Sequence, residues 1–166
     1  MPDTLPDAED LLARLARAIA PELTPETALV GIHTGGAWIA ERLHAQLGVA
    51  QPLGVLDISF YRDDFSRIGL HPQVKPSRIP FQVEDRPLIV VDDVLYTGRT
   101  VRAAMNELFD YGRPASIRLA VLVDRGGREL PICADFAGAR LNLPADRNLQ
   151  LTRNADGRLS LSQRNS

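Results

Sequence analysis

The sequence contains one cysteine and one lysine. Because Cys133 is the only cysteine among 166 residues, the chain cannot form an intrachain disulfide, and no Cys/His cluster has the spacing of a zinc site. Lys75 is the only lysine among 19 basic residues, so arginine carries nearly all the positive charge. A compositional bias of the source genome explains this imbalance most simply, but arginine is also the side chain that binds phosphate through paired hydrogen bonds.

A strong net charge and long apolar runs are also absent. The formal net charge is -2, whereas a nucleic-acid binder usually carries a basic excess. No apolar run approaches the ~20 residues that span a membrane. The N-terminus lacks the basic and apolar regions of a signal peptide. We therefore expect a cytoplasmic protein with no membrane partner.

The composition is that of an ordinary globular protein, with 45% hydrophobic and 24% charged residues, and the length suits a single domain over 1–166. Short apolar runs alternate with segments of helical apolar spacing. This order predicts an α/β fold whose mostly parallel sheet has right-handed crossovers. The expected strands are 28–32, 54–61, 88–91, 117–123, 132–136 and 149–152, and the expected helices are 11–19, 37–47 and 100–111.

Two further segments have their own patterns. Residues 62–80 combine charges with Gly69 and three prolines, and a polar stretch of this length inside a compact domain predicts a functional, mobile loop. Residues 149–162 alternate between apolar and polar side chains around a turn at 154–157. That pattern predicts a C-terminal hairpin.

Three polar loops follow predicted strands, at 34–36, 92–100 and 124–128. Because the carboxyl ends of parallel strands meet at one edge of a sheet, these loops are expected to lie together, where ligands of such sheets bind. The sequence therefore predicts one site built from segments that are far apart along the chain.

The loop over 92–100 carries the most specific chemistry. It starts with two adjacent carboxylates, Asp92 and Asp93, and ends at the start of a predicted helix. Carboxylates accept hydrogen bonds from ribose hydroxyls, while hydroxyl and N–H groups at a helix start bind a phosphate, and Gly98 allows a close backbone approach. The combination predicts a sugar-phosphate site. An ordinary capped helix beside solvated acids is the simpler alternative.

The whole string from Leu88 to Thr100 resembles the phosphoribosyl pyrophosphate (PRPP) motif of type I phosphoribosyltransferases, and the chain is more closely similar to the PyrR family. The resemblance covers about residues 10–152. It implies a type I phosphoribosyltransferase fold, an α/β fold with a mostly parallel central sheet, flanking helices and a small hood. The stretches that carry the resemblance are 29–36, 56–66, 88–103 and 119–131.

The resemblance also implies a reaction, in which uracil and PRPP give UMP and pyrophosphate. Mg²⁺ would act as cofactor and be held mainly by the substrate, without a dedicated metal cage in the chain. Asp92 and Asp93 match the catalytic acidic pair that faces the ribose. The other matched positions are Val94, Leu95, Tyr96, Thr97, Gly98, Arg99 and Thr100 in the PRPP loop, Thr34, Gly35 and Gly36 in the pyrophosphate loop, Tyr61, Arg62, Asp63 and Asp64 in the mobile loop, and Arg125 and Leu149 on the base side.

Several positions depart from the family pattern. Gly35 stands where attenuating PyrR proteins usually have an arginine, which puts pyrophosphate affinity in doubt. Gly127, Cys133 and Ala139 replace a histidine, an arginine and a lysine of the family's RNA-binding face. Because phosphate neutralisation supplies much of the affinity for nucleic acid, RNA binding should be weakened, with Arg128, Arg140 and Arg147 compensating in part.

Other interpretations remain open at the level of the sequence. The chain is alternatively an RNA attenuator controlled by UMP, a PRPP or nucleotide sensor with weak catalysis, or an enzyme acting on purine-type bases. Arg125 is alternatively a structural ion-pair partner of Asp124 or Glu129. The resemblance implies a homo-oligomer, a dimer or larger, and the Leu108–Phe109 end of the third predicted helix is a candidate contact.

Overall fold

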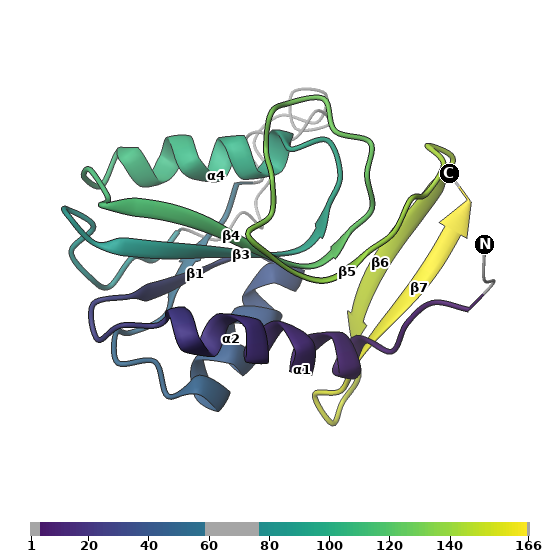
Figure 1. The fold of residues 1–166 in the computed structure, drawn as a ribbon, viewed down its shortest axis with the longest axis horizontal. Coiled ribbons are helices and arrows are strands. Elements are labelled where there is room, and N and C mark those ends of the chain that lie inside the picture. Colours follow the sequence, from purple (N-terminus) through teal and green to yellow (C-terminus); the bar gives the residue numbers. More distant parts are fainter. Residues whose placement is uncertain (1–3, 59–76, 166) are drawn as a thin grey trace.

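The computed structural model describes residues 4–58 and 77–165. Five strands form a sheet in the order β2-β1-β3-β4-β5, and every neighbouring pair is parallel (Figure 1). The predicted α/β fold with a mostly parallel sheet is therefore confirmed. The strands are β1 (Ala28–Ile32), β2 (Gly54–Leu56), β3 (Pro87–Leu95), β4 (Ser116–Asp124) and β5 (Phe136–Arg140).

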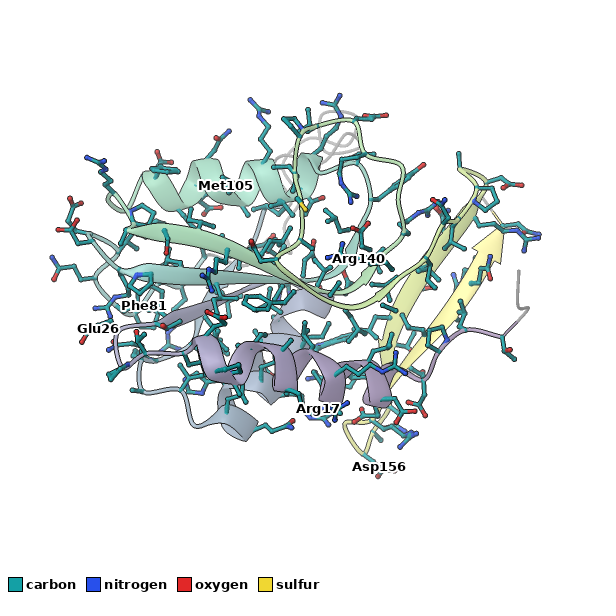
Figure 2. The ribbon with its side chains drawn as sticks, in the orientation of Figure 1. Arg17, Glu26, Phe81, Met105, Arg140 and Asp156 are labelled. Carbon is teal, nitrogen blue, oxygen red and sulfur yellow. The ribbon has the colours of Figure 1, made fainter. Side chains whose placement is uncertain are left out.

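Helices cover both faces of this sheet (Figure 1). α1 (Ala8–Ile19) and α2 (Gly35–Leu47) lie on one face, and α4 (Arg99–Phe109) lies on the other. Side chains of β3 alternate accordingly, because Ile89 and Val91 join the cluster under α1 and α2 while Val90 joins the one under α4. Met105, labelled in Figure 2, packs onto the second cluster. Burial on both faces explains the uninterrupted apolar run of β3.

The helix ends follow from local chemistry. α1 begins after Asp7, whose carboxylate accepts a hydrogen bond from the Glu9 backbone N–H at 2.8 Å. A short 3-10 turn, η1 (Ala20–Glu22), follows it. α2 ends at Gly48 in the left-handed conformation, as the sequence predicts. In the part of the chain that the structure describes, no helix is both long and apolar enough to cross a membrane.

Some predicted boundaries are wrong. The strand expected at 132–136 lies instead at Phe136–Arg140, because the Ile132 carbonyl accepts a hydrogen bond from the Arg128 side chain at 2.8 Å and the segment before Phe136 is a loop. Cys133 is consequently an exposed loop residue. Leu108 is fully buried in the core, which leaves Phe109, 54% exposed, as the apolar surface at the end of α4. β2 ends at Leu56, and residues 59–61 of the predicted strand lie outside the described residues.

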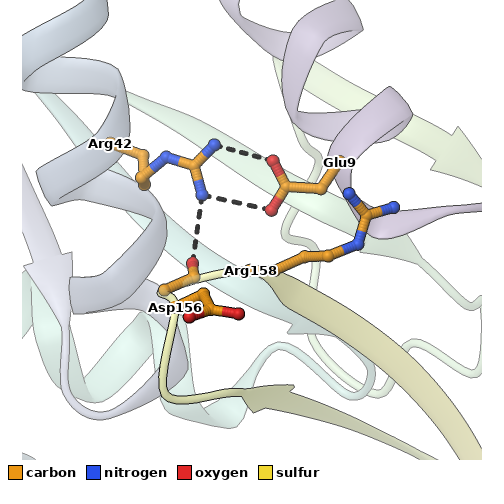
Figure 3. Close-up of a pocket in the computed structure, with 5 residues that line it drawn as sticks. Glu9, Arg42, Asp156 and Arg158 are labelled. Atoms are coloured by element: carbon orange, nitrogen blue, oxygen red, sulfur yellow. Dashed lines mark hydrogen bonds and ion pairs between the residues drawn. The ribbon is translucent and has the colours of Figure 1, made fainter.

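The C-terminal strands β6 (Arg147–Arg153) and β7 (Leu159–Asn165) pair antiparallel, separate from the main sheet. Glu9 joins this hairpin to both helices on that face: its carboxylate accepts hydrogen bonds from Arg42 at 2.7 and 3.1 Å and from the Leu159 backbone N–H at 2.8 Å. Arg42 also donates to the Gly157 carbonyl (Figure 3). The pocket of about 310 Å³ in Figure 3 is thus a structural joint between α1, α2 and the hairpin.

Candidate functional site

A cavity of about 790 Å³ opens beyond the carboxyl ends of β3 and β4. Its walls come from β3, the start of α4, the loop after β4 and the start of β6. Segments that are far apart along the chain, from Ile58 to Leu149, thus meet at one place, as expected for a parallel sheet. The residues singled out from the sequence that line it are Asp92, Asp93, Val94, Tyr96, Thr97, Arg99, Thr100, Arg125 and Leu149.

The two carboxylates lie within β3, because the strand continues to Leu95 instead of ending at Val91. The sequence predicted that Asp92 starts a loop after the strand. In the structure Asp92 is instead a strand residue and is only 6% exposed, so this part of the prediction is wrong. Asp92 Oδ1 accepts a hydrogen bond from the Asp93 N–H, and Asp93 Oδ1 accepts one from the Val94 N–H, both at 2.8 Å. These local bonds orient both acids while β4 holds the strand backbone.

The turn after β3 is held by hydrogen bonds at Thr97 and by the backbone conformation of Gly98. The Thr97 carbonyl accepts hydrogen bonds from the backbone N–H groups of Glu129 and Leu130, at 2.9 and 3.1 Å. Gly98 has a φ of 95°, which favours glycine, and α4 begins directly after it. The result is a helix start with two threonine hydroxyls at the cavity, the kind of place that binds a phosphate.

An ion pair stands at the mouth of this helix start. Arg99 Nε donates to Glu129 Oε1 at 2.8 Å, and both side chains are more than half exposed. Since exposed pairs of this kind contribute little to stability, Arg99 can exchange its partner at small cost when an anion arrives.

The loop over 34–36 lies directly against β3. Gly35 and Gly36 form the first turn of α2, which begins two residues earlier than the helix predicted from Ala37. A Cβ on Gly35 would stand 2.8 Å from the Asp93 Cγ, so this loop adjoins the acidic pair although it does not line the large cavity. The loop over 92–100 also contacts the third predicted loop, since the Arg125 N–H donates to the Leu95 carbonyl at 3.1 Å. The structure therefore brings all three predicted loops together.

Arg125 makes neither of the ion pairs considered from the sequence. Its side chain is 2% exposed and donates to the backbone carbonyls of Arg147 and Pro144. The Glu129 carboxylate pairs with Arg99 instead. The Asp124 carboxylate pairs with other arginines.

Arg128 and Arg140 are the arginines that pair with the Asp124 carboxylate. Arg128 Nη2 donates to both Asp124 carboxylate oxygens, at 2.8 and 2.7 Å, and Arg140 (Figure 2) adds a third bond at 3.1 Å. Burial raises the pKa of Asp124, but the hydrogen bonds from Arg128 and the Gly126 N–H outweigh it, and the pKa lies below its ordinary value. Arg128 also donates to the Tyr96 and Ile132 carbonyls. Much of the basic charge expected to compensate on the RNA face is thus committed inside the chain.

Six cavity residues were not predicted from the sequence: Ile58, Arg102, Ala103, Asn106, Glu129 and Asn148. A signal for three of them exists, because Arg102, Ala103 and Asn106 follow Arg99 at the three- and four-residue spacing of one helix face. The mobile-loop positions Tyr61, Arg62, Asp63 and Asp64 lie outside the described residues.

No metal cage is formed by the described residues, among which no three or more His, Cys, Asp or Glu side chains come together. The cavity nevertheless presents the Asp92 and Asp93 carboxylates, which are the hard oxygen donors that Mg²⁺ prefers. This donor set fits an ion that takes most of its ligands from a substrate and from water.

Comparison with known proteins agrees with this geometry. A family model described as "Phosphoribosyl transferase domain" matches residues 3–142. "Bifunctional protein PyrR" of Nitrosococcus oceani is 59% identical over 145 residues, which cover 86% of this chain and 82% of that protein. The protein of the same name from Pseudomonas fluorescens is 53% identical over 155 residues, covering 93% and 89%.

Solved structures resemble the chain in fold. A hypoxanthine-guanine phosphoribosyltransferase from Bacillus anthracis superposes with a TM-score of 0.66 at 18% identity, covering 85% of each chain. A hypoxanthine phosphoribosyltransferase from Staphylococcus aureus gives a TM-score of 0.62 at 18% identity, covering 89% of this chain and 81% of the other. At such identity only the fold is shared. The family model and the PyrR relatives show that the chain belongs to the PyrR family of phosphoribosyltransferases.

Proposed function

We propose that this protein is a uracil phosphoribosyltransferase that converts uracil and PRPP into UMP and pyrophosphate, with a regulatory role in pyrimidine metabolism. The observation that carries the proposal is the pairing of Asp92 and Asp93 with the start of α4 in one cavity. The relatives named "Bifunctional protein PyrR" support both the enzymatic and the regulatory part of the proposal.

The reaction breaks the bond between ribose C1 and the pyrophosphate oxygen, forms a bond from C1 to the uracil nitrogen, and releases the proton of that nitrogen. Positive charge develops on the ribose in the transition state, so the negative charge of Asp92 and Asp93 is placed to stabilise it. Thr97, Thr100 and the first N–H groups of α4 would hold the 5′-phosphate. Catalysis of this kind consists mostly of positioning.

The remaining assignments complete the proposed site. The loop of Thr34, Gly35 and Gly36 would bind pyrophosphate through its backbone. The segment that starts with Tyr61, Arg62, Asp63 and Asp64 would close over bound PRPP and exclude water. Mg²⁺ bound with PRPP would neutralise phosphate charge, and the Asp92 and Asp93 carboxylates are the described side chains that would contribute oxygen ligands.

A base-competition assay tests the proposed activity. Purified protein is supplied with PRPP, Mg²⁺ and an equal mixture of uracil, hypoxanthine, guanine and orotate, and the nucleotides formed are separated. UMP should dominate. Formation of IMP or GMP instead would identify a purine-type enzyme. PRPP binding without any turnover would identify a sensor and overturn the proposed enzyme.

Control of pyrimidine genes through RNA is the second candidate, and the PyrR relatives favour a regulatory role. We propose that direct RNA binding is weak, since Gly127, Cys133 and Ala139 lack basic side chains and Arg128 and Arg140 are both paired with the Asp124 carboxylate. A gel shift with a pyrimidine-operon leader at about 0.15 M salt tests this. A tight, UMP-dependent complex would overturn it.

The proposal also covers the oligomeric state and the subcellular localisation of the protein. We propose a cytoplasmic homo-oligomer, a dimer or larger, to which the exposed Phe109 at the end of α4 is a candidate contributor. Size-exclusion chromatography with light scattering measures the assembly, and a monomer at micromolar concentration would contradict it. Replacing Phe109 by Ser tests the contribution of that surface.

A further inference from the structure

Arg125 is a buried guanidinium at the wall of the large cavity. Its two terminal nitrogens donate to the carbonyls of Arg147 and Pro144, the latter at 2.8 Å. No carboxylate pairs with it among the described residues. A buried arginine that binds only carbonyl groups is unusual, because desolvation of the charge is costly without an opposite charge. Its position therefore calls for a role beyond an ion pair.

Pro144 lies in the segment joining β5 to β6, and Arg147 is the first residue of β6. The backbone of Arg125 holds the same segment, since its carbonyl accepts a hydrogen bond from the Leu143 N–H at 3.2 Å. Asn148 and Leu149, which follow directly, line the same cavity as the acidic pair. One residue thus ties the loop after β4 to the wall formed by Asn148 and Leu149.

Tyr96 holds the guanidinium from a further side. The Arg125 Cζ lies 3.9 Å from the centre of the Tyr96 ring, which is a close cation–π contact. The ring has room because residue 127 is glycine: a Cβ on Gly127 would stand 2.5 Å from the Tyr96 Cε1. Gly127 also has a φ of 86°, which a side chain rarely adopts.

The remaining donor of Arg125 is not satisfied. Its Nε is buried and has no hydrogen-bond partner among the described residues. A buried charged group with an unmade hydrogen bond lowers the stability of the fold. Stability alone therefore does not explain why an arginine stands at position 125. The rigid fork of the guanidinium, however, is pre-organised to donate to two separate carbonyls at once from one stem.

We propose that Arg125 is a positioning residue that sets the base-side wall of the site by latching the 144–147 segment, with Tyr96 and Gly127 fixing the guanidinium. It acts through Asn148 and Leu149 and thereby controls affinity for the planar base, not for the ribose phosphate. The identity of the base as uracil rests on the proposed function.

The latch itself is tested without any ligand. Amide hydrogen exchange is measured by mass spectrometry in the wild-type protein, Arg125→Gln and Arg125→Lys. Arg118→Gln is the matched control, because Arg118 also lies over an aromatic ring, Phe136, and pairs with Glu22 on the surface. Exchange in residues 141–150 should rise roughly tenfold or more in Arg125→Gln and less in Arg125→Lys, while residues 88–95 stay protected. Unchanged exchange in 141–150 would overturn the latch.

The effect of the Arg125 latch on ligand binding is tested by titration calorimetry with two probes, UMP and ribose 5-phosphate. Arg125→Gln should weaken UMP roughly tenfold to hundredfold and ribose 5-phosphate less than about twofold, with part of the UMP affinity restored in Arg125→Lys. Equal weakening of both probes would overturn a base-side role.

Gly127→Ala provides a variant that keeps the buried charge but crowds the Tyr96 ring and strains the loop at a φ of 86°, and it should weaken UMP in the same selective way. UMP binding without turnover in the wild-type protein would refute the enzyme and leave this inference standing. A wild-type protein that makes UMP, together with an Arg125→Gln variant that binds UMP as tightly as the wild type, would overturn this inference alone.

Discussion

Gly36 lies against the backbone of Val91, and a Cβ on Gly36 would stand 2.5 Å from the Val91 carbonyl oxygen and 2.9 Å from the Asp92 Cα. Backbone atoms of a central strand cannot move aside as a flexible side chain can. The first turn of α2 therefore reaches the acidic pair only because this position has no side chain.

Replacing Gly36 by Ala should lower the free energy of unfolding by about 1–3 kcal/mol, the usual cost of overpacking. Gly35→Ala is the matched change one residue earlier, where a Cβ would meet only the Asp93 side chain, so its loss of stability should be smaller. Urea denaturation of both variants measures the difference. Equal destabilisation would show that α2 shifts as a unit and that the close approach of Gly36 is not the determinant.

Replacing both Asp92 and Asp93 by Asn should reduce turnover of PRPP by at least about a hundredfold, because the charge that stabilises the developing cation is lost. The fold should remain, since asparagine retains an oxygen that accepts the bonds from the Asp93 and Val94 N–H groups. Initial rates together with circular dichroism check both statements. Asp110→Asn, at the exposed end of α4, is the control and should keep full activity. Undiminished turnover in the double variant would remove the acidic pair from the mechanism.

Arg99 donates to Glu129, so Glu129 would compete with a bound phosphate for this arginine. Glu129→Gln removes a negative charge from the cavity and should lower the KM for PRPP a few fold, with the effect shrinking as salt rises because the pair is exposed. Stability should change by less than about 1 kcal/mol. Steady-state kinetics at about 0.05 and 0.5 M salt measure the trend. A raised KM would mean that Glu129 itself helps to bind the substrate.

Glu9 should make the stability of the protein sensitive to acid. The hydrogen bonds from Arg42 lower the pKa of Glu9 below 4.5 despite the opposing effect of burial, and the bond from the Leu159 N–H adds to them. A carboxyl whose folded pKa is depressed stabilises the fold above its unfolded pKa, and this contribution is lost as the pH falls through the folded value. Glu9→Gln should thus cost about 1 kcal/mol at pH 7, since Arg42 is partly exposed, and almost nothing near pH 3.

Thermal unfolding between pH 3 and pH 7 measures this difference. Glu41→Gln is the control, because Glu41 of α2 meets Arg153 of β6 at 3.6 Å in an exposed pair that does not involve Glu9. A cost that persists at pH 3 would mean that the Glu9 charge is not its source.

The sequence was sufficient for the centre of the fold. The runs at 28–32 and 88–91 predict buried strands because apolar side chains fill both faces, and the loops after them meet for topological reasons alone. The site could be located in this way, and nine of its lining residues were named. The wrong strand boundary depends on side-chain contacts that the local sequence pattern does not show. The wrong strand at 132–136 reflects the hydrogen bond from Arg128 to Ile132, and apolar spacing carries no information about such a bond.

The arginines show the same limit. In sequence, Arg125, Arg128 and Arg140 are equivalent cations near Asp124. In the structure, Arg128 and Arg140 bind that carboxylate, whereas Arg125 turns to backbone carbonyls. Which arginine pairs with the acid depends on the register of β4 against β5, where Asp124 lies opposite Arg140. No local pattern specifies that register.

Restoring two basic side chains should strengthen RNA binding. Cys133→Arg introduces a cation on an exposed loop, and Ala139→Lys extends one from β5, where a lysine stem can lie along apolar surface and keep its charge in water. The double variant should bind a pyrimidine-operon leader RNA roughly tenfold or more tightly at about 0.15 M salt. Its log affinity should fall more steeply with log salt, by up to about 0.7 for each new phosphate contact. A variant with Gln at both positions controls for size and polarity. Equal affinity of the two variants would show that missing charge at these positions is not what limits RNA binding.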